Sequence, residues 1–366
     1  MGESGVGLNG RRRLRELGLA PGLMPPGPLN AITDVVGVRV GQVTRLDGAD
    51  GPFNTGVTAI LPHEGDLFGE RVPAAFEVLN GSGEVYGREF VDEMGVLDSP
   101  IMLTGSLNVA RVADAVITET IRSHPEIGKG DRFVHPFVAE CSDAYFSDLG
   151  ARPVGQTETV AAWHDATDGA VPEGCVGAGT GLVSYEFKAG IGTASRRAEI
   201  AEQEYTIGVL VSTNTGLREQ LRIDGVPVGR ELDVARPSWV AQGSIVIIVA
   251  TDAPLLPRQL RRLAKRSFLG LARTGATGQN GSGDFALAFS TGNRLQLDGP
   301  LKVVSELDDR VVSPLFDATC EATEEAIWNA LCAAHEFTGL NGNWAPALPL
   351  DDLLAVMTRY GHTPKL

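Results

Sequence analysis

The sequence has little that would support a metal site, a disulfide framework or a bound cofactor. Its 366 residues include only four cysteines and six histidines. None of the cysteines forms a Cys-x-x-Cys pair and no closely spaced histidine pair accompanies them, so neither a metal nor an organic cofactor is expected. Scattered thiols in a chain of this size are typical of a reducing compartment, and we therefore expect a cytoplasmic protein.

Positive charge and long apolar runs are also scarce. Lysine and arginine number 31 against 46 acidic residues, which gives a formal net charge of −15. Such a chain repels phosphate backbones and anionic lipids, so nucleic acid and membrane surfaces are not expected as partners. The sequence has no run of about 18 apolar residues. Prolines and glycines interrupt residues 17–29 after the basic N-terminal segment, so no signal peptide is predicted.

Apolar periodicity predicts strands and helices that are mixed along the whole chain. Residues 1–30 are expected to form an irregular arm. Strands are predicted at 35–44, 55–62, 72–80, 206–212, 243–251 and 285–290, and helices at 108–124, 257–272, 314–337 and 349–360. Because no internal repeat or low-complexity linker separates them, we predict one α/β domain spanning residues 1–366.

A serine between two glycines lies in the stretch 275–290, GATGQNGSGDFALAFS. Ser282 stands between Gly281 and Gly283, directly ahead of an apolar predicted strand. Flanking glycines let the backbone take strained conformations and let other groups approach closely. One interpretation is a simple turn, because Asn280-Gly281 is a common turn dipeptide. The spacing does not match a G-x-S-x-G nucleophile elbow.

The other interpretation is self-cleavage at this serine. The hydroxyl of Ser282 attacks the carbonyl of Gly281, the ester hydrolyses, and Ser282 becomes a new N-terminus. Its α-amine, with a reference pKa of about 8, can then act as the base for its own hydroxyl. Such a mechanism needs no histidine, and the histidines here show no catalytic spacing.

Nine segments, in order over nearly the whole chain, carry a family resemblance. Two of them read GVLVSTNTG (208–216) and NGSGDFALAFST (280–291). The others are 26–44, 54–62, 78–87, 108–117, 177–181, 321–331 and 347–353. Through these segments the chain resembles the family of the L-aminopeptidase/D-Ala-esterase–amidase and the β-peptidyl aminopeptidases. The members of this family are self-processing serine hydrolases of the N-terminal-nucleophile type. Each segment alone is weakly specific, whereas their joint order is highly specific.

The resemblance implies a four-layer α-β-β-α sandwich and a precursor that is cut before the nucleophile. The products would be residues 1–281 and 282–366. Members of the family release the N-terminal residue from peptides, amides or esters, and some accept D-residues or β-amino acids. The resemblance thus implies an aminopeptidase or amidase that forms an acyl-enzyme, and a homo-oligomer of processed heterodimers.

The resemblance also implies roles for particular residues. Ser282 matches the nucleophile, and Asn214 matches the residue that helps to form the oxyanion hole. A fixed amide that donates to a developing oxyanion typically contributes about 10²–10³ in rate. Tyr145 is expected to donate to the same oxyanion. Either Glu140 or Asp143 is expected to hold the ammonium group of the substrate, which would explain a requirement for a free N-terminus.

The segment Ala322-Thr323-Glu324 departs from the pattern of the β-peptide-cleaving relatives. Those relatives carry Ser-Thr-Glu there, and the serine and glutamate support the amine and hydroxyl of the nucleophile. Glu324 matches that pattern, whereas Ala322 replaces the serine. Thr323 or a water molecule would have to supply the missing hydroxyl.

Two other functions are compatible with the sequence. An acyltransferase resembling the ornithine acetyltransferases would pass the acyl group to an amine rather than to water, although the nucleophile of those enzymes is usually threonine. A non-catalytic scaffold would keep the fold without being cleaved, and Ala322 is the residue that favours it. A scaffold would show neither cleavage nor labelling by serine-reactive acylating agents.

Overall fold

The central strands carry apolar side chains on both faces, so each sheet has to be covered on both sides. In strand β12 (Ser244–Thr251), Ile245 and Ile247 belong to one buried cluster, whereas Val246 and Ile248 belong to another. Side chains alternate between the two faces of a strand, so these clusters lie on opposite sides of one sheet. A sheet that is apolar on both faces becomes the inner layer of a sandwich.

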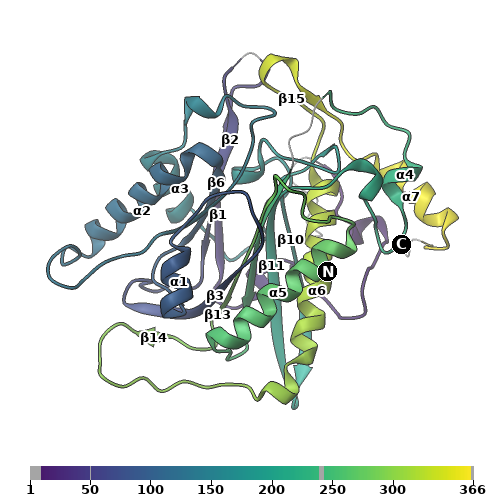
Figure 1. Cartoon of the computed structure of the whole chain (residues 1–366). Helices are drawn as coiled ribbons and strands as arrows, with labels where there is room; N and C mark the ends of the chain where they lie inside the picture. Colours follow the sequence, from purple (N-terminus) through teal and green to yellow (C-terminus); the bar gives the residue numbers. More distant parts are fainter. Residues whose placement is uncertain (1–9, 50, 239–242, 364–366) are drawn as a thin grey trace.

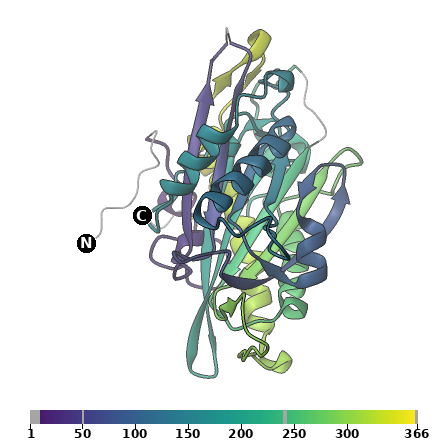
Figure 2. The same cartoon turned by 90° about the vertical axis from the view of Figure 1, so that its left-hand side faces the viewer.

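The computed structural model describes residues 10–49, 51–238 and 243–363, and these contain two large sheets. The larger sheet has the order β10-β11-β12-β13-β3-β14, with β5 also paired to β3. Its strands are β10 (Ile191–Ile200), β11 (Gln203–Asn214), β12, β13 (Gly283–Ser290), β3 (Glu70–Gly81), β14 (Leu295–Gln296) and β5 (Val96–Leu97). The β10–β11 turn, with Ala201 and Glu202 at positive φ, projects beyond the sheets as the teal hairpin of Figure 2.

The smaller sheet has the order β1-β2-β6-β7-β4. Its strands are β1 (Arg39–Leu46), β2 (Asn54–Leu61), β6 (Ile101–Gly105), β7 (Phe137–Cys141) and β4 (Val85–Tyr86). Two short ribbons pair β8 (Val183–Ser184) with β9 (Phe187–Lys188) and β15 (Phe337–Thr338) with β16 (Trp344–Ala345).

Helices cover the outer faces of both sheets, which gives the four layers visible in Figure 1. The helices are α1 (Arg88–Met94), α2 (Val109–Ser123), α3 (Gln156–His164), α4 (Val228–Glu231), α5 (Pro257–Arg273), α6 (Ser313–Ala333) and α7 (Leu350–Arg359). Helices α2 and α3 pack on the smaller sheet, and α5 and α6 pack on the larger one. Among the described residues, no helix combines the length and the apolar character that crossing a bilayer requires.

Three apolar cores separate the four layers. Between the two sheets, Phe76, Leu103 and Ile248 belong to one buried cluster. A second cluster lies between the larger sheet and its helices, and a third lies between the smaller sheet and α2 and α3. The α/β class and the four-layer α-β-β-α sandwich expected from the sequence are confirmed.

Two predicted boundaries are wrong for identifiable reasons. Strand β1 begins at Arg39 rather than at residue 35, because Gly37 takes a φ of +91°, outside the β region. Helix α6 ends at Ala333 rather than at residue 337, because Phe337 and Thr338 pair with β16 instead. Residues 10–30 are irregular as predicted, apart from the short 3₁₀ helix Arg15–Leu17, but they pack against the core, because Leu14 and Leu17 are buried beside α6.

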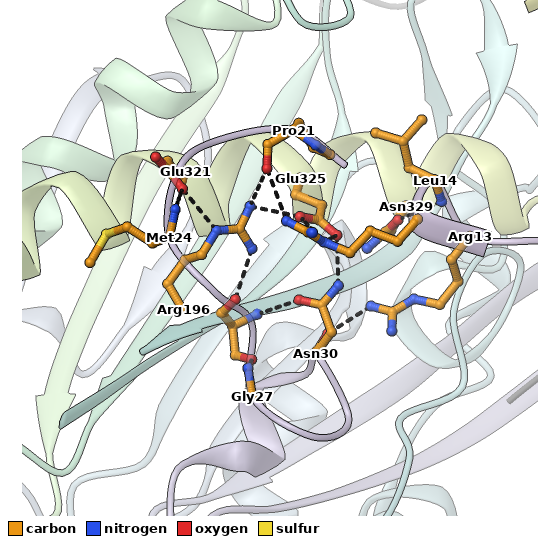
Figure 3. A network of polar contacts seen from close by, with 12 residues as sticks. Arg13, Leu14, Pro21, Met24, Gly27, Asn30, Arg196, Glu321, Glu325 and Asn329 are labelled. Carbon is orange, nitrogen blue, oxygen red and sulfur yellow. Dashed lines mark hydrogen bonds and ion pairs between the residues drawn. The ribbon is translucent and has the colours of Figure 1, made fainter. Parts of the chain in front are cut away.

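Buried ion pairs hold this N-terminal segment onto β10 and α6 (Figure 3). Arg196 of β10 is fully buried and contacts Glu325 of α6 at 2.7 Å and Glu321 at 3.0 Å. Arg15 contacts Glu325 at 2.9 Å, and the amide of Asn30 donates to the same carboxylate at 2.6 Å. Burial alone would raise the pKa of Glu325, but Arg196 and Arg15 outweigh this effect and lower it.

We expect Arg196→Met to reduce the free energy of unfolding by about 3 kcal/mol, because it leaves buried carboxylates with too few cations. The measurement is urea unfolding followed by fluorescence. The matched control is Arg258→Met, since Arg258 forms an exposed ion pair with Asp309 and should change stability little. Equal effects of the two substitutions would contradict a structural role of the buried network.

Candidate active site

Ser282 lies at the start of a strand in the middle of the larger sheet. The following strand, β13, is parallel to β12 on one side and antiparallel to β3 on the other. Gly283 is in register with Ser244 of β12 and with Gly81 of β3. The side chain of Ser282 is fully buried, so neighbouring strands fix its position on both sides.

The hydroxyl of Ser282 donates a hydrogen bond to Asp284. The distance from Oγ to Oδ1 is 2.5 Å, and both side chains are buried. The second carboxylate oxygen of Asp284, Oδ2, is buried without a hydrogen-bond partner. Burial raises the pKa of Asp284, and the hydrogen bond from Ser282 opposes that shift. The serine therefore faces a carboxylate that is more basic than usual.

Residues 279–282 form the turn that the dipeptide Asn280-Gly281 indicates, and Asn80 of β3 contacts it. The N–H of Ser282 donates to the carbonyl of Gln279 at 2.8 Å, which closes a β-turn around Asn280 and Gly281. The side-chain amide of Asn80 lies 3.0 Å from the carbonyl of Gln279, 3.2 Å from that of Asn280 and 2.5 Å from that of Ser282. Asn80 thus contacts the backbone on both sides of the Gly281–Ser282 peptide bond.

Asn214 lies at the end of β11, in register with Ser244 at the start of β12. Its amide donates to the carbonyl of Ser142 at 2.8 Å, and its Oδ1 accepts from the N–H of Val183 at 3.2 Å. The amide of an asparagine has two hydrogens, so one remains for a further acceptor. The hydroxyl of Tyr145 donates to the carbonyl of Trp344 at 2.9 Å. A role of Tyr145 toward an oxyanion would require its hydroxyl to leave that acceptor.

The two acidic candidates, Glu140 within strand β7 and Asp143 just after its end, differ in their partners. Glu140 accepts from the hydroxyl of Ser106 at 2.5 Å and from the N–H of Glu84 at 3.1 Å. Asp143 is also buried, but its Oδ2 makes no hydrogen bond. Burial raises the pKa of both carboxyls, that of Asp143 to about 6, although the nearby hydroxyl of Thr55 acts to lower the pKa of Asp143. A Cβ atom at Gly105 would lie 2.7 Å from Oδ2 of Asp143, so the glycine leaves room for this carboxylate.

The carboxylate of Glu324 faces helix α5 and does not accept the hydrogen bond of the Ser282 hydroxyl. Its carboxylate lies 3.6 Å from Nη1 of Arg273. Burial raises the pKa of Glu324 to about 7 although Arg273 opposes that shift. Since the single hydroxyl proton of Ser282 is donated to Asp284, it is not donated to Glu324. Ala322 is buried in the apolar core, and Thr323 donates its hydroxyl to the carbonyl of Thr319 in its own helix.

The structure thus adds two residues to which the sequence assigns no role. Asp284 follows Ser282 by two positions, and side chains at that spacing on a strand point to the same face. That spacing could have suggested their contact. Asn80 reaches the turn only because β3 pairs with β13, with Asn80 opposite Asp284, and nothing local in the sequence indicates that pairing. No group of three or more His, Cys, Asp or Glu side chains in the described residues is arranged to hold a metal ion.

The comparisons with known proteins decide the family. The model of peptidase family S58 matches residues 30–345. The chain belongs to peptidase family S58. A beta-peptidyl aminopeptidase of Sphingosinicella xenopeptidilytica is 40% identical to it, over 94% of this chain and 90% of the relative.

Two solved structures also resemble the chain closely. A beta-aminopeptidase of a Burkholderia species has a TM-score of 0.90 and 40% identity, covering 96% of this chain and 100% of that one. The L-aminopeptidase D-Ala-esterase/amidase of Ochrobactrum anthropi has a TM-score of 0.89 and 36% identity, covering 96% of this chain and 99% of that one. The latter is described as a variant of the Ntn hydrolase fold and a prototype of the serine aminopeptidases.

The family confirms several expectations at once. This S58 chain is a serine-type hydrolase of the N-terminal-nucleophile kind and an aminopeptidase. The comparisons favour this interpretation over an acyltransferase or a non-catalytic scaffold. The roles of Ser282, Asn214, Tyr145, Glu140, Asp143 and Glu324, and the cleavage after Gly281, stay predictions.

We expect Asn80→Ala to loosen the turn at residues 279–282. Asn80 is partly buried, and loss of its hydrogen bonds to three carbonyls costs about 1–1.5 kcal/mol, so amides in residues 277–285 should exchange about five- to tenfold faster. The measurement is hydrogen exchange by mass spectrometry in a Ser282→Ala background, which keeps the chain uniform. Asn293→Ala is the control, because Asn293 donates to Ser305 in a different loop. Unchanged exchange at 277–285 in the Asn80 variant would refute the contact.

Proposed function

We propose that the chain cuts itself between Gly281 and Ser282 and then acts as an aminopeptidase with Ser282 as nucleophile. The observation that carries the proposal is the placement of Ser282, immediately before a central strand and after a held turn. Cleavage there would leave the α-amine of Ser282 beside its own hydroxyl. That amine would then take the hydroxyl proton when Oγ attacks a substrate carbonyl.

Asn214 would stabilise the oxyanion of this reaction. Its free amide hydrogen lies at an end of the larger sheet that also holds the start of β13, two strands away. Tyr145 would join it after exchanging the carbonyl of Trp344 for the oxyanion. The acyl-enzyme would release the amine product, and water would hydrolyse the ester. Glu324, with its raised pKa, would support the α-amine only after moving away from Arg273.

Asp143 is the better of the two candidates for holding the ammonium group of the substrate. Both oxygens of Glu140 already accept hydrogen bonds, whereas Oδ2 of Asp143 is buried and unpartnered. A buried carboxylate without a cation favours a ligand that brings one. This difference explains how the site would select peptides, amides or esters with a free N-terminus.

The relatives suggest the class of substrate residue that is released. A beta-peptidyl aminopeptidase and a beta-aminopeptidase are each 40% identical to the chain, against 36% for the L-aminopeptidase D-Ala-esterase/amidase. We therefore place N-terminal β-amino acids first among the substrates, with D- and L-α-amino acids as the alternatives. Amides of β-alanine, D-alanine and L-alanine would rank these preferences.

Assembly and location complete the proposal. All four cysteines are free and buried, which suits a reducing compartment such as the cytoplasm.

The segment between β14 and α6 extends away from the layers (Figure 1). The side chains of Leu301 and Val303 in this segment are 82% and 91% exposed. Exposed apolar side chains of this kind support assembly into a homo-oligomer of processed heterodimers.

Ser282→Ala should abolish both cleavage and amidase activity, because it removes the oxygen that attacks in both reactions. Intact mass under denaturing conditions should show residues 1–281 and 282–366 for the wild type and one full-length chain for the variant. Ser305→Ala, which alters an exposed serine, is the control and should behave like the wild type. A wild-type chain that stays intact for days would refute the self-cleavage.

Asp143→Asn should weaken the binding of substrates that carry a free amine, whereas the slow background turnover of N-acetylated esters, which bring no ammonium group, should stay unchanged. Losing a charged hydrogen bond costs about 1.5–3 kcal/mol, so kcat/KM should fall about 10- to 100-fold, mainly through KM. In the wild type, KM should rise as pH falls below about 6, where this carboxyl becomes protonated. If Glu140→Gln has the larger effect on KM, Glu140 rather than Asp143 binds the ammonium group of the substrate.

A further inference from the structure

We propose that Asp284 is the general base of the self-cleavage, a role that it has only in the uncut chain. The inference rests on the proposed cleavage between Gly281 and Ser282. It starts from the short hydrogen bond of 2.5 Å by which the hydroxyl of Ser282 donates to Asp284.

The uncut chain needs a base other than the one that serves the mature enzyme. In the mature enzyme the α-amine of Ser282 takes the hydroxyl proton. Before cleavage that nitrogen is an amide, whose lone pair is delocalised into the peptide bond and which cannot accept a proton near neutral pH. Its N–H is also occupied, because it donates to the carbonyl of Gln279. The first cleavage therefore cannot use the mechanism of later turnovers.

Asp284 is the side chain to which the structure directs that proton. A serine hydroxyl has one hydrogen, and here it is donated to Oδ1 of Asp284. Burial makes this carboxylate a stronger base than an exposed one, since it raises the pKa of Asp284. A base with a pKa closer to the working pH takes a proton more effectively in a transition state. The free, buried Oδ2 leaves the carboxyl a second position to carry the proton.

The same strand pair holds the bond to be cut. Asn80, opposite Asp284 in register, contacts the carbonyls of Asn280 and Ser282 on either side of Gly281. The N–H of Ser82 also donates to the carbonyl of Ser282 at 3.1 Å. Asn80 is thus a positioning residue, because it restrains the peptide units on either side of the scissile bond while Asp284 acts on the hydroxyl.

The reaction balances with water as its only co-reactant. Asp284 takes the hydroxyl proton as Oγ bonds to the carbonyl carbon of Gly281. The bond between that carbon and the nitrogen of Ser282 breaks, and the protonated carboxyl returns its proton to the nitrogen, which leaves a free amine and an ester. Water then hydrolyses the ester to the carboxylate of Gly281 and the hydroxyl of Ser282, and the proton released goes to the new amine. Asp284 ends as a carboxylate beside the new amine.

The test follows the full-length chain from its synthesis in a cell-free translation reaction. Cleavage to 1–281 and 282–366 is timed on denaturing gels for the wild type, Asp284→Asn and Asp284→Ser. Asp298→Asn, which alters a mostly exposed carboxylate, is the matched control. We expect both Asp284 variants to cleave at least about 100-fold more slowly, the usual contribution of a general base, and the control to match the wild type. Circular dichroism verifies that the uncut variants are folded.

The pH profile of the wild type gives a second test that needs no variant. The groups facing Asp284 are Tyr185, between β8 and β9, and Cys141, at the end of β7. Burial raises the pKa of both, so they stay neutral in acid and do not shape that part of the profile. Cleavage should slow as pH falls toward the raised pKa of Asp284, above the ordinary aspartate value of about 3.9.

The outcomes separate this inference from the proposed function. A wild-type chain that never cleaves overturns both. Wild-type cleavage with an Asp284→Asn variant that cleaves equally fast overturns the role of Asp284 and leaves Ser282 as the nucleophile. If the variants do not fold, a wild-type rate that stays constant from about pH 8 to pH 4 also overturns that role.

Discussion

The parallel pairing of β12 with β13 is the constraint on which the candidate site depends. Parallel neighbours cannot be joined by a tight turn, so the chain has to cross over the sheet between them. Here the crossover contains helix α5 and the glycine-containing residues 274–282. It returns Ser282 to the same end of the sheet at which β12 begins. The position of the serine is therefore set by the topology of the sheet and does not depend on a flexible loop.

This topology also explains why a cut before Ser282 would leave the fold intact. Strand β13 is hydrogen-bonded to β12 on one side and to β3 on the other, and α6 packs over the same sheet. On the other side of the cut, residues 10–30 are joined to α6 by the buried pairs of Arg15 and Arg196 with Glu325. Both fragments would thus contribute strands to the larger sheet and a helix to the layer that covers it. The covalent link between Gly281 and Ser282 contributes little to holding them together.

The sequence predicts the parts of the structure that are encoded locally. The apolar runs that became β12 and β13 and the periodic helix α5 are recognisable, as is the turn at Asn280 and Gly281. Strand β10 is missed because its residues include two adjacent arginines, and one of them, Arg196, is fully buried only through carboxylates about 125 positions away. No local pattern can indicate a partner at that separation.

The same limit applies within the site. Glu140 and Asp143 cannot be distinguished by the sequence. Only the positions of Ser106 and Glu84 show that both oxygens of Glu140 accept hydrogen bonds, whereas Oδ2 of Asp143 accepts none. The resemblance to a family supplied candidates for the oxyanion hole, but it could not show that Tyr145 donates to Trp344 or that Glu324 faces Arg273. Such contacts depend on which hydrogen-bond partners the assembled layers bring within reach.

Burial of Ser282 separates the chemistry of the uncut chain from that of the cut one. In the continuous chain the serine is the last residue of the turn 279–282 and is fully buried, so a substrate cannot reach its hydroxyl. The carbonyl available to attack is then one from its own backbone. Asn80 ties that turn to β3 through the carbonyls of Gln279, Asn280 and Ser282, and a cut after Gly281 would separate the first two from the third. The new chain end could then withdraw, which would uncover Ser282 only after the α-amine needed for turnover has been formed.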